Sequence, residues 1–169
     1  MNKQTKTLAI MGLLTAIALI FGYLERLLPA FPNLPGVKIG LGNTVLLFAL
    51  YFMKKSQAFI LLIAKVTLTG LLFSGISAMM YAFAGGLLSI AAMLSAKKIR
   101  GISIIGVSCV GAVFHNIGQV SLAAIIVRTP TLLWYLPVLI VIGAVMGILI
   151  GTIAKFVIRN LENAIQNSK

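Results

Sequence analysis

Long apolar runs separated by short basic segments constrain this chain more than any other feature of its sequence. Six runs cover residues 7–24, 39–53, 58–73, 75–94, 102–127 and 132–154. Most approach the ~20 residues that an α-helix needs to cross a bilayer, although the second and third are short. Hydrophobic residues make up 60% of the chain and charged residues only 9%, far from the usage of soluble globular domains. We therefore predict an all-α integral membrane protein with six transmembrane helices in one domain, residues 1–169.

The basic residues are distributed unevenly between the two sides of this topology. Of the 14 Lys and Arg residues, ten fall on the side of the termini, whereas the opposite side holds Arg26, Lys38 and Arg128. Cytoplasmic segments of membrane proteins carry the excess of Lys and Arg, so we predict cytoplasmic N- and C-termini in a bacterial plasma membrane. This distribution accounts for most of the net charge of +12 and leaves no basic face for nucleic acid.

Two segments outside the apolar runs have distinctive compositions. Between the first and second runs, Pro29, Pro32 and Pro35 exclude regular helix and predict a semi-rigid extended loop. After the last run, residues 155–169 alternate apolar and polar positions. We expect a cytoplasmic amphipathic tail there, either as an extension of the last span or as a short interfacial helix.

Polar side chains gather in the middle of the fifth apolar run. His115 and Gln119 are four residues apart and therefore share one face of a helix, with Asn116 beside them. Polar groups at this depth are costly unless they face a partner or a cavity. They can satisfy one another within the bundle or contact a ligand. Three such groups within five residues exceed what packing requires, which favours ligand contact.

Lys65 lies near the middle of the third run, where its insertion costs roughly 2.5–3.5 kcal/mol unless the charge is relieved. It can snorkel toward the surface, face a bound anion, or pair with Glu25, the one acidic residue on the outer side. Asn43 follows Gly40 and Gly42 near the outer end of the second run, where small neighbours allow the close approach of backbone or ligand.

Together these groups predict a polar pocket that opens to the outside. The predicted substrate-binding residues are Asn43, Lys65, His115, Asn116 and Gln119, with Lys38 and Arg128 at the outer mouth beside Arg26. Aromatic and methionine side chains expected nearby are Phe48, Tyr51, Met79, Met80, Tyr81 and Trp134, the last of which also fits an interfacial aromatic belt. A small molecule with an anionic or hydrogen-bonding head and a flat or apolar body suits this pocket. Vitamins, flavins, quinone precursors and prenyl phosphates all match that description.

Small residues recur at helical spacing in two of the runs. Gly143, Gly147 and Gly151 form a ridge in the last run that allows another helix to approach closely. Gly12 and Ala16 have the same spacing in the first run. Contacts within this chain and contacts with a second protein are both compatible with the spacing, and contact within the chain is the favoured interpretation for the last run.

Two motifs resemble a known family. Pro35-Gly36-Val37-Lys38-Ile39-Gly40-Leu41-Gly42-Asn43 leads into the second run, and His115-Asn116-Ile117-Gly118-Gln119 lies in the fifth. With the six-span layout, they resemble the Gx transporter family, also described as heptaprenyl diphosphate synthase component I. The resemblance covers roughly residues 6–160. That family looks like the substrate-binding (S) components of energy-coupling factor (ECF) importers.

The resemblance implies a six-helix bundle with an outward-facing ligand pocket and a role in ABC-type import. It also implies two kinds of partner, a transmembrane coupling subunit and cytoplasmic ATPases, and the sequence has no phosphate-binding loop motif of its own. S components meet the coupling subunit through small residues of the first helix, commonly Ala-x-x-x-Ala. The nearest match here is Gly12-x-x-x-Ala16, which departs from the pattern at one position.

The inventory of reactive side chains argues against autonomous catalysis. Prenyl diphosphate synthases of the usual kind hold magnesium through aspartate-rich motifs, but both acidic residues of this chain are glutamates, Glu25 and Glu162, predicted on opposite membrane faces. The single His115 and single Cys109 cannot complete a metal site or an acid–base pair with them. We predict no enzyme activity, no metal and no cofactor. The alternative function is a non-catalytic membrane subunit associated with prenyl-diphosphate or quinone synthesis or with a membrane redox system. Independent secondary transport is a weaker third interpretation, because no acidic residue lies at mid-membrane.

Overall fold

The described part of the chain is almost entirely helical. The structure, a computed structural model, describes residues 2–27 and 40–167. Its α-helices are α1 (Lys3–Leu27), α2 (Leu41–Phe52), α3 (Lys55–Thr69), α4 (Ile76–Ala96), α5 (Ile104–Ile126) and α6 (Leu136–Asn167). A π-helical turn, η1 (Gly70–Ser74), continues α3, and a 3₁₀ helix, η2 (Pro130–Tyr135), leads into α6. No strand occurs within these residues, so the all-α class is confirmed.

Five helical stretches are long and apolar enough to cross a membrane. They are Gln4–Leu27, Lys55–Ser74, Ile76–Ala96, Ile104–Ile126 and Pro130–Asn163. The remaining apolar helix, α2, has only 12 residues and is about 18 Å long, shorter than the ~30 Å hydrocarbon core. The structure therefore confirms a bundle of apolar, membrane-type helices, while the sixth crossing and the cytoplasmic termini stay predictions. The predicted proline-rich loop lies outside the described residues.

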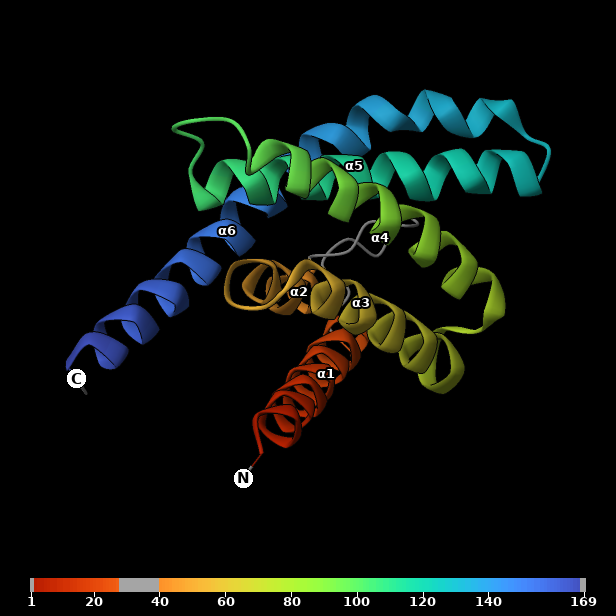
Figure 1. The fold of residues 1–169 in the computed structure, drawn as a ribbon. Coiled ribbons are helices and arrows are strands. Elements are labelled where there is room, and N and C mark those ends of the chain that lie inside the picture. The colour runs from red at the N-terminus through yellow and green to blue at the C-terminus, as the bar shows by residue number, and fades with distance from the viewer. Residues whose placement is uncertain (1, 28–39, 168–169) are drawn as a thin grey trace.

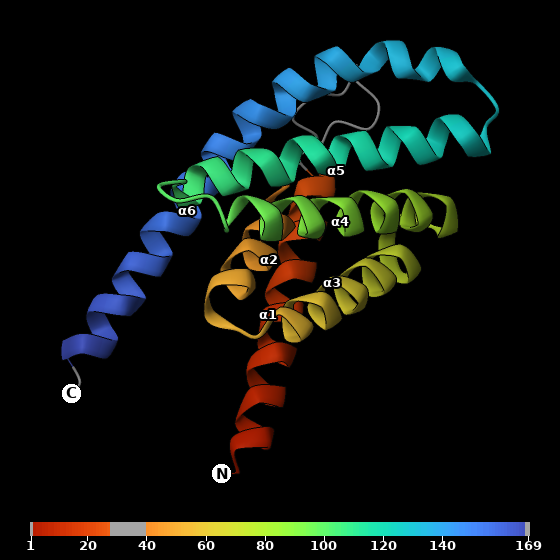
Figure 2. The same ribbon diagram turned by 45° about the horizontal axis from the view of Figure 1, so that its top comes forward.

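The helices pack as two groups that meet around a central space. α4 and α5 lie side by side, and α6 packs along α5 before its C-terminal part extends away from the other helices (Figures 1 and 2). α1 packs against α2 and α3. The N-terminal part of α1 and the C-terminal part of α6 extend toward the same side of the molecule (Figures 1 and 2).

The glycine ridge of α6 is used inside this bundle. A Cβ atom at Gly147 would lie 2.6 Å from the Cα atom of Cys109, and one at Gly151 would lie 2.8 Å from the Cα atom of Ile105. The backbones of α5 and α6 are therefore in direct contact, as small-residue ridges allow in membranes. The favoured interpretation of this ridge, a contact within the chain, is confirmed.

The buried core is formed mainly by α2 and α3, with further residues from the other α-helices. The fully buried large side chains are Leu47, Leu61, Leu62 and Val107. α3 begins with its Gln57 side chain accepting a hydrogen bond of 2.9 Å from the backbone N–H of Lys54, which satisfies a donor at the helix start. α2 and α3 follow one another closely and pack together as an antiparallel helical hairpin. Residues from the start of α2 therefore lie beside residues from the second half of α3.

α3 and α4 are joined without a loop. The π-helical turn η1 ends at Gly75, whose φ of +82° belongs to the region that favours glycine, and whose N–H donates to the Gly70 carbonyl over 2.8 Å. π-helical turns widen a helix locally and are frequent at functional sites. The expectation that spans three and four follow one another almost directly is confirmed.

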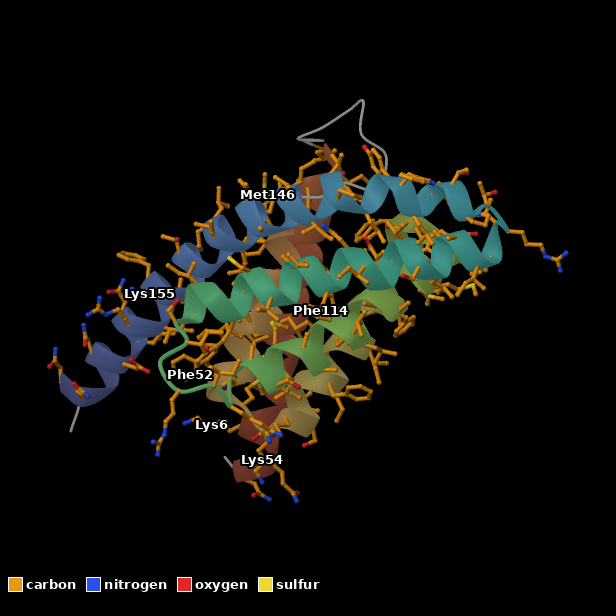
Figure 3. All side chains as sticks on the ribbon, turned by 90° about the horizontal axis from the view of Figure 1, so that it is seen from above. Lys6, Phe52, Lys54, Phe114, Met146 and Lys155 are labelled. Atoms are coloured by element: carbon orange, nitrogen blue, oxygen red, sulfur yellow. The ribbon has the colours of Figure 1, made fainter. Side chains whose placement is uncertain are left out.

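The predicted amphipathic tail is the continuation of α6. The helix runs without interruption to Asn167. Of the two alternatives for the tail, the structure shows an extension of the last span and not a separate interfacial helix. Ile158 is its last buried residue among those with described side chains. Lys6, Lys54 and Lys155 lie toward the part of the molecule that holds the start of α1 and the end of α6 (Figure 3).

The close contact between α5 and α6 yields a first prediction. Gly147→Leu should lower the stability of the bundle by about 1–3 kcal/mol, because its side chain has to displace the backbone at Cys109. Thermal unfolding in detergent measures this. The matched control is Gly12→Leu, since nothing lies within 4 Å of a Cβ atom at Gly12. Equal unfolding midpoints for both variants would contradict the observed packing.

Candidate functional site

A cavity of about 440 Å³ lies at the centre of the bundle, between the two groups of helices. Every α-helix contributes to its wall, with Glu25 from α1, Asn43 from α2, Lys65 from α3, Met79 from α4 and, at its far side, His115 from α5 and Met146 from α6. The π-helical turn contributes Phe73 and Ser74. A volume of this size is in the range of small-molecule sites, which are typically about 300–1,000 Å³.

The cavity brings together five of the seven residues that the sequence predicted to bind substrate. Those that line it are Asn43, Lys65, His115, Asn116 and Gln119. Lys38 lies outside the described residues. Arg128 is described but does not line the cavity; it follows the end of α5, about 13 Å beyond Gln119 along the helix axis, and is exposed. The structure does not support its predicted position at the mouth.

Lys65 and Asn43 contact each other directly. The Nζ atom of Lys65 donates a hydrogen bond of 2.6 Å to Oδ1 of Asn43, which joins α3 to the start of α2. Gly42 provides the space for this approach, because a Cβ atom there would lie 3.1 Å from Cε and 3.2 Å from Nζ of the lysine. Of the environments considered for Lys65, the structure shows an ammonium group directed into the cavity and hydrogen-bonded there.

His115 and Gln119 share a face of α5, as their spacing predicts, and this face packs against α4 at Gly85. A Cβ atom at Gly85 would lie 2.6 Å from the carbonyl oxygen of His115 and 2.7 Å from Cγ of Gln119. The absence of a side chain at this position therefore lets α4 approach α5 beside the two polar groups. Packing and cavity lining, considered as alternatives for His115, occur together.

Asn116 has a partner within the bundle. Its Nδ2 atom donates a hydrogen bond of 2.8 Å to the carbonyl oxygen of Leu139 in the first turns of α6. Gly143 makes room for this carboxamide, since a Cβ atom there would lie 2.7 Å from Nδ2. Asn116 thus fixes α6 against α5 at the cavity wall, and its carbonyl oxygen is the group left to accept from a ligand or from water.

Sequence reasoning missed the way in which Glu25 is held. A side-chain oxygen of Glu25 accepts a hydrogen bond from the backbone N–H of Gly40, which precedes α2 with a φ of +84°. This contact ties the C-terminal end of α1 to the start of α2, and Glu25 and Gly40 both line the cavity. The signal was present in the sequence, because Glu25 is the one acidic residue of the outer half and Gly40 belongs to the glycine-rich motif.

The apolar walls differ from the expected ones. Of the aromatic and methionine residues expected near the pocket, Met79 lines it, whereas Phe48, Tyr51, Met80, Tyr81 and Trp134 do not. Phe73 and Met146 were not expected and do line it. Trp134 is 85% exposed beside the end of α5, as an interfacial aromatic would be. Helices that are apolar on all sides give no periodic signal for the face that meets a cavity.

The charged groups of the cavity are unequal in number. Lys65 and Arg26 contribute two positive charges, and Glu25 contributes one negative charge. The Glu25 carboxylate accepts from the Gly40 N–H, and the Lys65 ammonium donates to a neutral amide. With two positive charges and one negative charge, the charged side chains that line the cavity have a net charge of +1.

A second region of interest is the outer face of α1. Only 6% of the apolar span within Gln4–Leu27 is buried inside the bundle. Gly12 has open space where a side chain would be, and Ala16, one turn later, is exposed. The structure thus leaves this small-residue face available for a neighbour in the membrane.

Comparison with known proteins agrees with the motifs. A family model described as heptaprenyl diphosphate synthase component I matches residues 14–157, a range that includes every cavity-lining residue. No curated protein and no solved structure is significantly similar to the chain. The description names one component of a synthase and so assigns no catalytic step to this chain by itself. On the extent of this match, the chain belongs to the heptaprenyl diphosphate synthase component I family, the family that its two motifs resemble.

Proposed function

We propose that this protein is the substrate-binding component of an ECF-type importer, which captures a small anionic, partly apolar molecule from outside the cell. The observation that carries the proposal is the cavity of about 440 Å³, where Lys65, Asn43, His115 and Gln119 converge from three helices. Converging polar groups in an otherwise apolar pocket are the usual mark of a ligand site. The family resemblance to S components supplies the transport role.

The chemistry of the walls supports an amphipathic ligand. Lys65 and Arg26 provide positive charge for an anionic head, and the amides of Asn43 and Gln119 provide both donors and acceptors. Phe73, Met79 and Met146 provide apolar and polarizable surface for a flat or aliphatic body. The ligand would displace or share the Lys65–Asn43 hydrogen bond, which positions the lysine.

The exposed face of α1 supports a protein partner within the membrane. Gly12 and Ala16 would allow a helix of a transmembrane coupling subunit to approach α1 closely. The coupling subunit would in turn connect the bundle to cytoplasmic ATPases. In this proposal α1 has two roles, because its opposite end contributes Glu25 and Arg26 to the cavity.

The family description favours one alternative, a non-catalytic membrane subunit of a prenyl-diphosphate synthase. Within residues 2–27 and 40–167, no group of three His, Cys, Asp or Glu side chains lies close enough to hold a metal ion. A catalytic diphosphate site of the usual magnesium-dependent kind would need such carboxylates. In this alternative the cavity would hold the apolar end of a prenyl chain or of a quinone precursor, and chemistry would take place on a partner.

Purification from the native membrane distinguishes the two functions. We expect a transmembrane coupling protein, ATPase subunits and a small anionic molecule to be found with this chain by mass spectrometry. A soluble prenyltransferase without ATPases would overturn the importer proposal and support the alternative. Mild, lipid-preserving extraction is needed, because membrane interfaces built on small residues depend on close packing alone.

The cavity residues yield a second test. Lys65→Gln and Asn43→Ala should each weaken retention of the co-purified small molecule about 10–100-fold, as expected for the loss of a charge-assisted hydrogen bond of ~1.5–3 kcal/mol. Ligand occupancy is measured by native mass spectrometry. Arg128→Gln is the matched control, because it removes a cation that lies outside the cavity. His115→Ala tests the α5 wall of the cavity and should also weaken retention of the small molecule.

The outcome is read together with thermal stability. Ligand loss with an unfolding midpoint near that of the parent protein supports a binding role for Asn43, Lys65 and His115. A large fall in the midpoint of all three variants would instead assign these residues to packing. Equal ligand loss in the Arg128→Gln control would show that overall charge, and not the cavity, determines retention.

The α1 face yields a third test. Gly12→Leu should leave ligand retention and stability unchanged but reduce the amount of coupling subunit that co-purifies, because the leucine occupies the space a partner helix would use. Gly12→Ala is the conservative companion and should retain most of the partner. Normal assembly of the Gly12→Leu variant would exclude this face as the contact.

A further inference from the structure

Five cationic side chains lie on two neighbouring turns of the bundle. Lys54 precedes α3 and Lys55 is its first residue, at the turn that follows α2, whereas Lys97, Lys98 and Arg100 belong to the turn between α4 and α5. All five are exposed. Neither turn contains an acidic residue: Glu25 is held by Gly40 at the cavity, and Glu162 lies near the end of α6. We refer to these residues as the cationic turn pair.

Lys97 joins the two turns. Its Nζ atom donates a hydrogen bond of 2.8 Å to the carbonyl oxygen of Leu50 near the end of α2 and lies 4.0 Å from the centre of the Tyr51 ring. This cation therefore satisfies a C-terminal helix carbonyl and contacts an aromatic face. Burial, and secondly the charge of Lys55 at the first turn, lower the pKa of Lys97.

The tip of the second turn combines cations with an aliphatic side chain. Ile99, between Lys98 and Arg100, is 62% exposed. The conformation is defined by hydrogen bonds from the N–H groups of Lys98 to Ser95 and of Ile99 to Ala96, over 3.1 and 2.9 Å. Phe52, two residues before Lys54, is 38% exposed beside the first turn. The pair thus presents apolar side chains next to positive charge in a fixed arrangement.

This combination matches the boundary of a phospholipid leaflet. Ammonium and guanidinium groups pair with phosphate oxygens, and apolar side chains insert among the upper acyl segments. An acidic protein surface would match the charges but gives no role to an exposed isoleucine between two of them. If these charges served only to set the orientation of the chain in the membrane, their number would be sufficient and a defined turn conformation would not be needed.

We propose that the cationic turn pair binds the phosphate headgroup of an anionic phospholipid in the leaflet that faces the cytoplasm. The proposal depends on the orientation predicted from charge asymmetry, and not on the ligand of the cavity. In this site Lys97 holds the two turns together. The headgroup contacts Lys98, Arg100, Lys54 and Lys55, and the acyl chains contact Ile99. Repulsion between the turns decreases when the lipid phosphate lies between them.

The experiment compares phosphatidylglycerol with phosphatidylcholine. The purified protein in phosphatidylcholine nanodiscs is titrated with phosphatidylglycerol, and bound lipid is counted by native mass spectrometry alongside the unfolding midpoint. Lys98→Gln/Arg100→Gln should weaken phosphatidylglycerol binding about 30-fold, from about 1 kcal/mol for each basic residue at an anionic surface. Lys97 is left unchanged, because its loss would alter the packing of the turns.

The matched control is Lys155→Gln/Arg159→Gln, which removes the same charge from the tail of α6 and should bind phosphatidylglycerol like the parent protein. Equal weakening in both double variants, or no preference for phosphatidylglycerol in the parent protein, would overturn the proposal.

Ile99→Ser should also weaken lipid binding. If Ile99→Ser has no effect while a soluble acidic peptide displaces the lipid, the surface is a protein-docking site instead. Retention of the cavity ligand in every variant keeps this result separate from the importer proposal.

Discussion

The hydrogen bond between Lys65 and Asn43 is the interaction on which the interior of this bundle depends. A lysine at this depth in an apolar helix is costly unless its ammonium group has a polar neighbour. Asn43 supplies one at 2.6 Å, and Gly42 supplies the space. Because the pair joins α2 to α3, the charge is positioned by the same hairpin that forms the buried core. The ammonium group of Lys65 is therefore held at the cavity wall by the packing of α2 against α3.

Glycine positions make the polar centre compatible with close helix packing. Gly85 allows α4 to approach α5 beside His115, and Gly143 admits the Asn116 carboxamide between α5 and α6. Larger residues would separate the helices or displace the polar groups. Hydrophobic burial does not hold helices together in lipid, so contact of this kind has to come from packing and interhelical hydrogen bonds. The glycines that form the bundle are in this way the residues that shape the cavity.

The sequence was sufficient to predict the helical class, most helix positions and five polar residues of the cavity, because apolar length and isolated polar groups are strong signals in a membrane protein. It was less informative where the signal is geometric. The second run is short in the sequence and α2 has only 12 residues, so its crossing of the bilayer stays a prediction. Arg128 does not line the cavity, because α5 continues for about two turns beyond Gln119. Phe73 and Met146 were not identified, since a helix that is apolar all round does not indicate which face meets a cavity.

The position of the cavity bears on both functions considered for the family. A ligand within it would contact α1 through Glu25 and Arg26, and the same helix exposes Gly12 and Ala16 about two to four turns away. A rigid helix of this kind can transmit occupancy of the cavity to a neighbour only if it has different contacts in the filled and empty states. If the ligand is an anion, as proposed, it would share the cavity with the Glu25 carboxylate, which accepts a hydrogen bond from Gly40. Repulsion between that carboxylate and an anionic ligand would favour a shift of α1 on binding. The same argument holds whether the protein that contacts α1 in the membrane is a coupling subunit or a synthase.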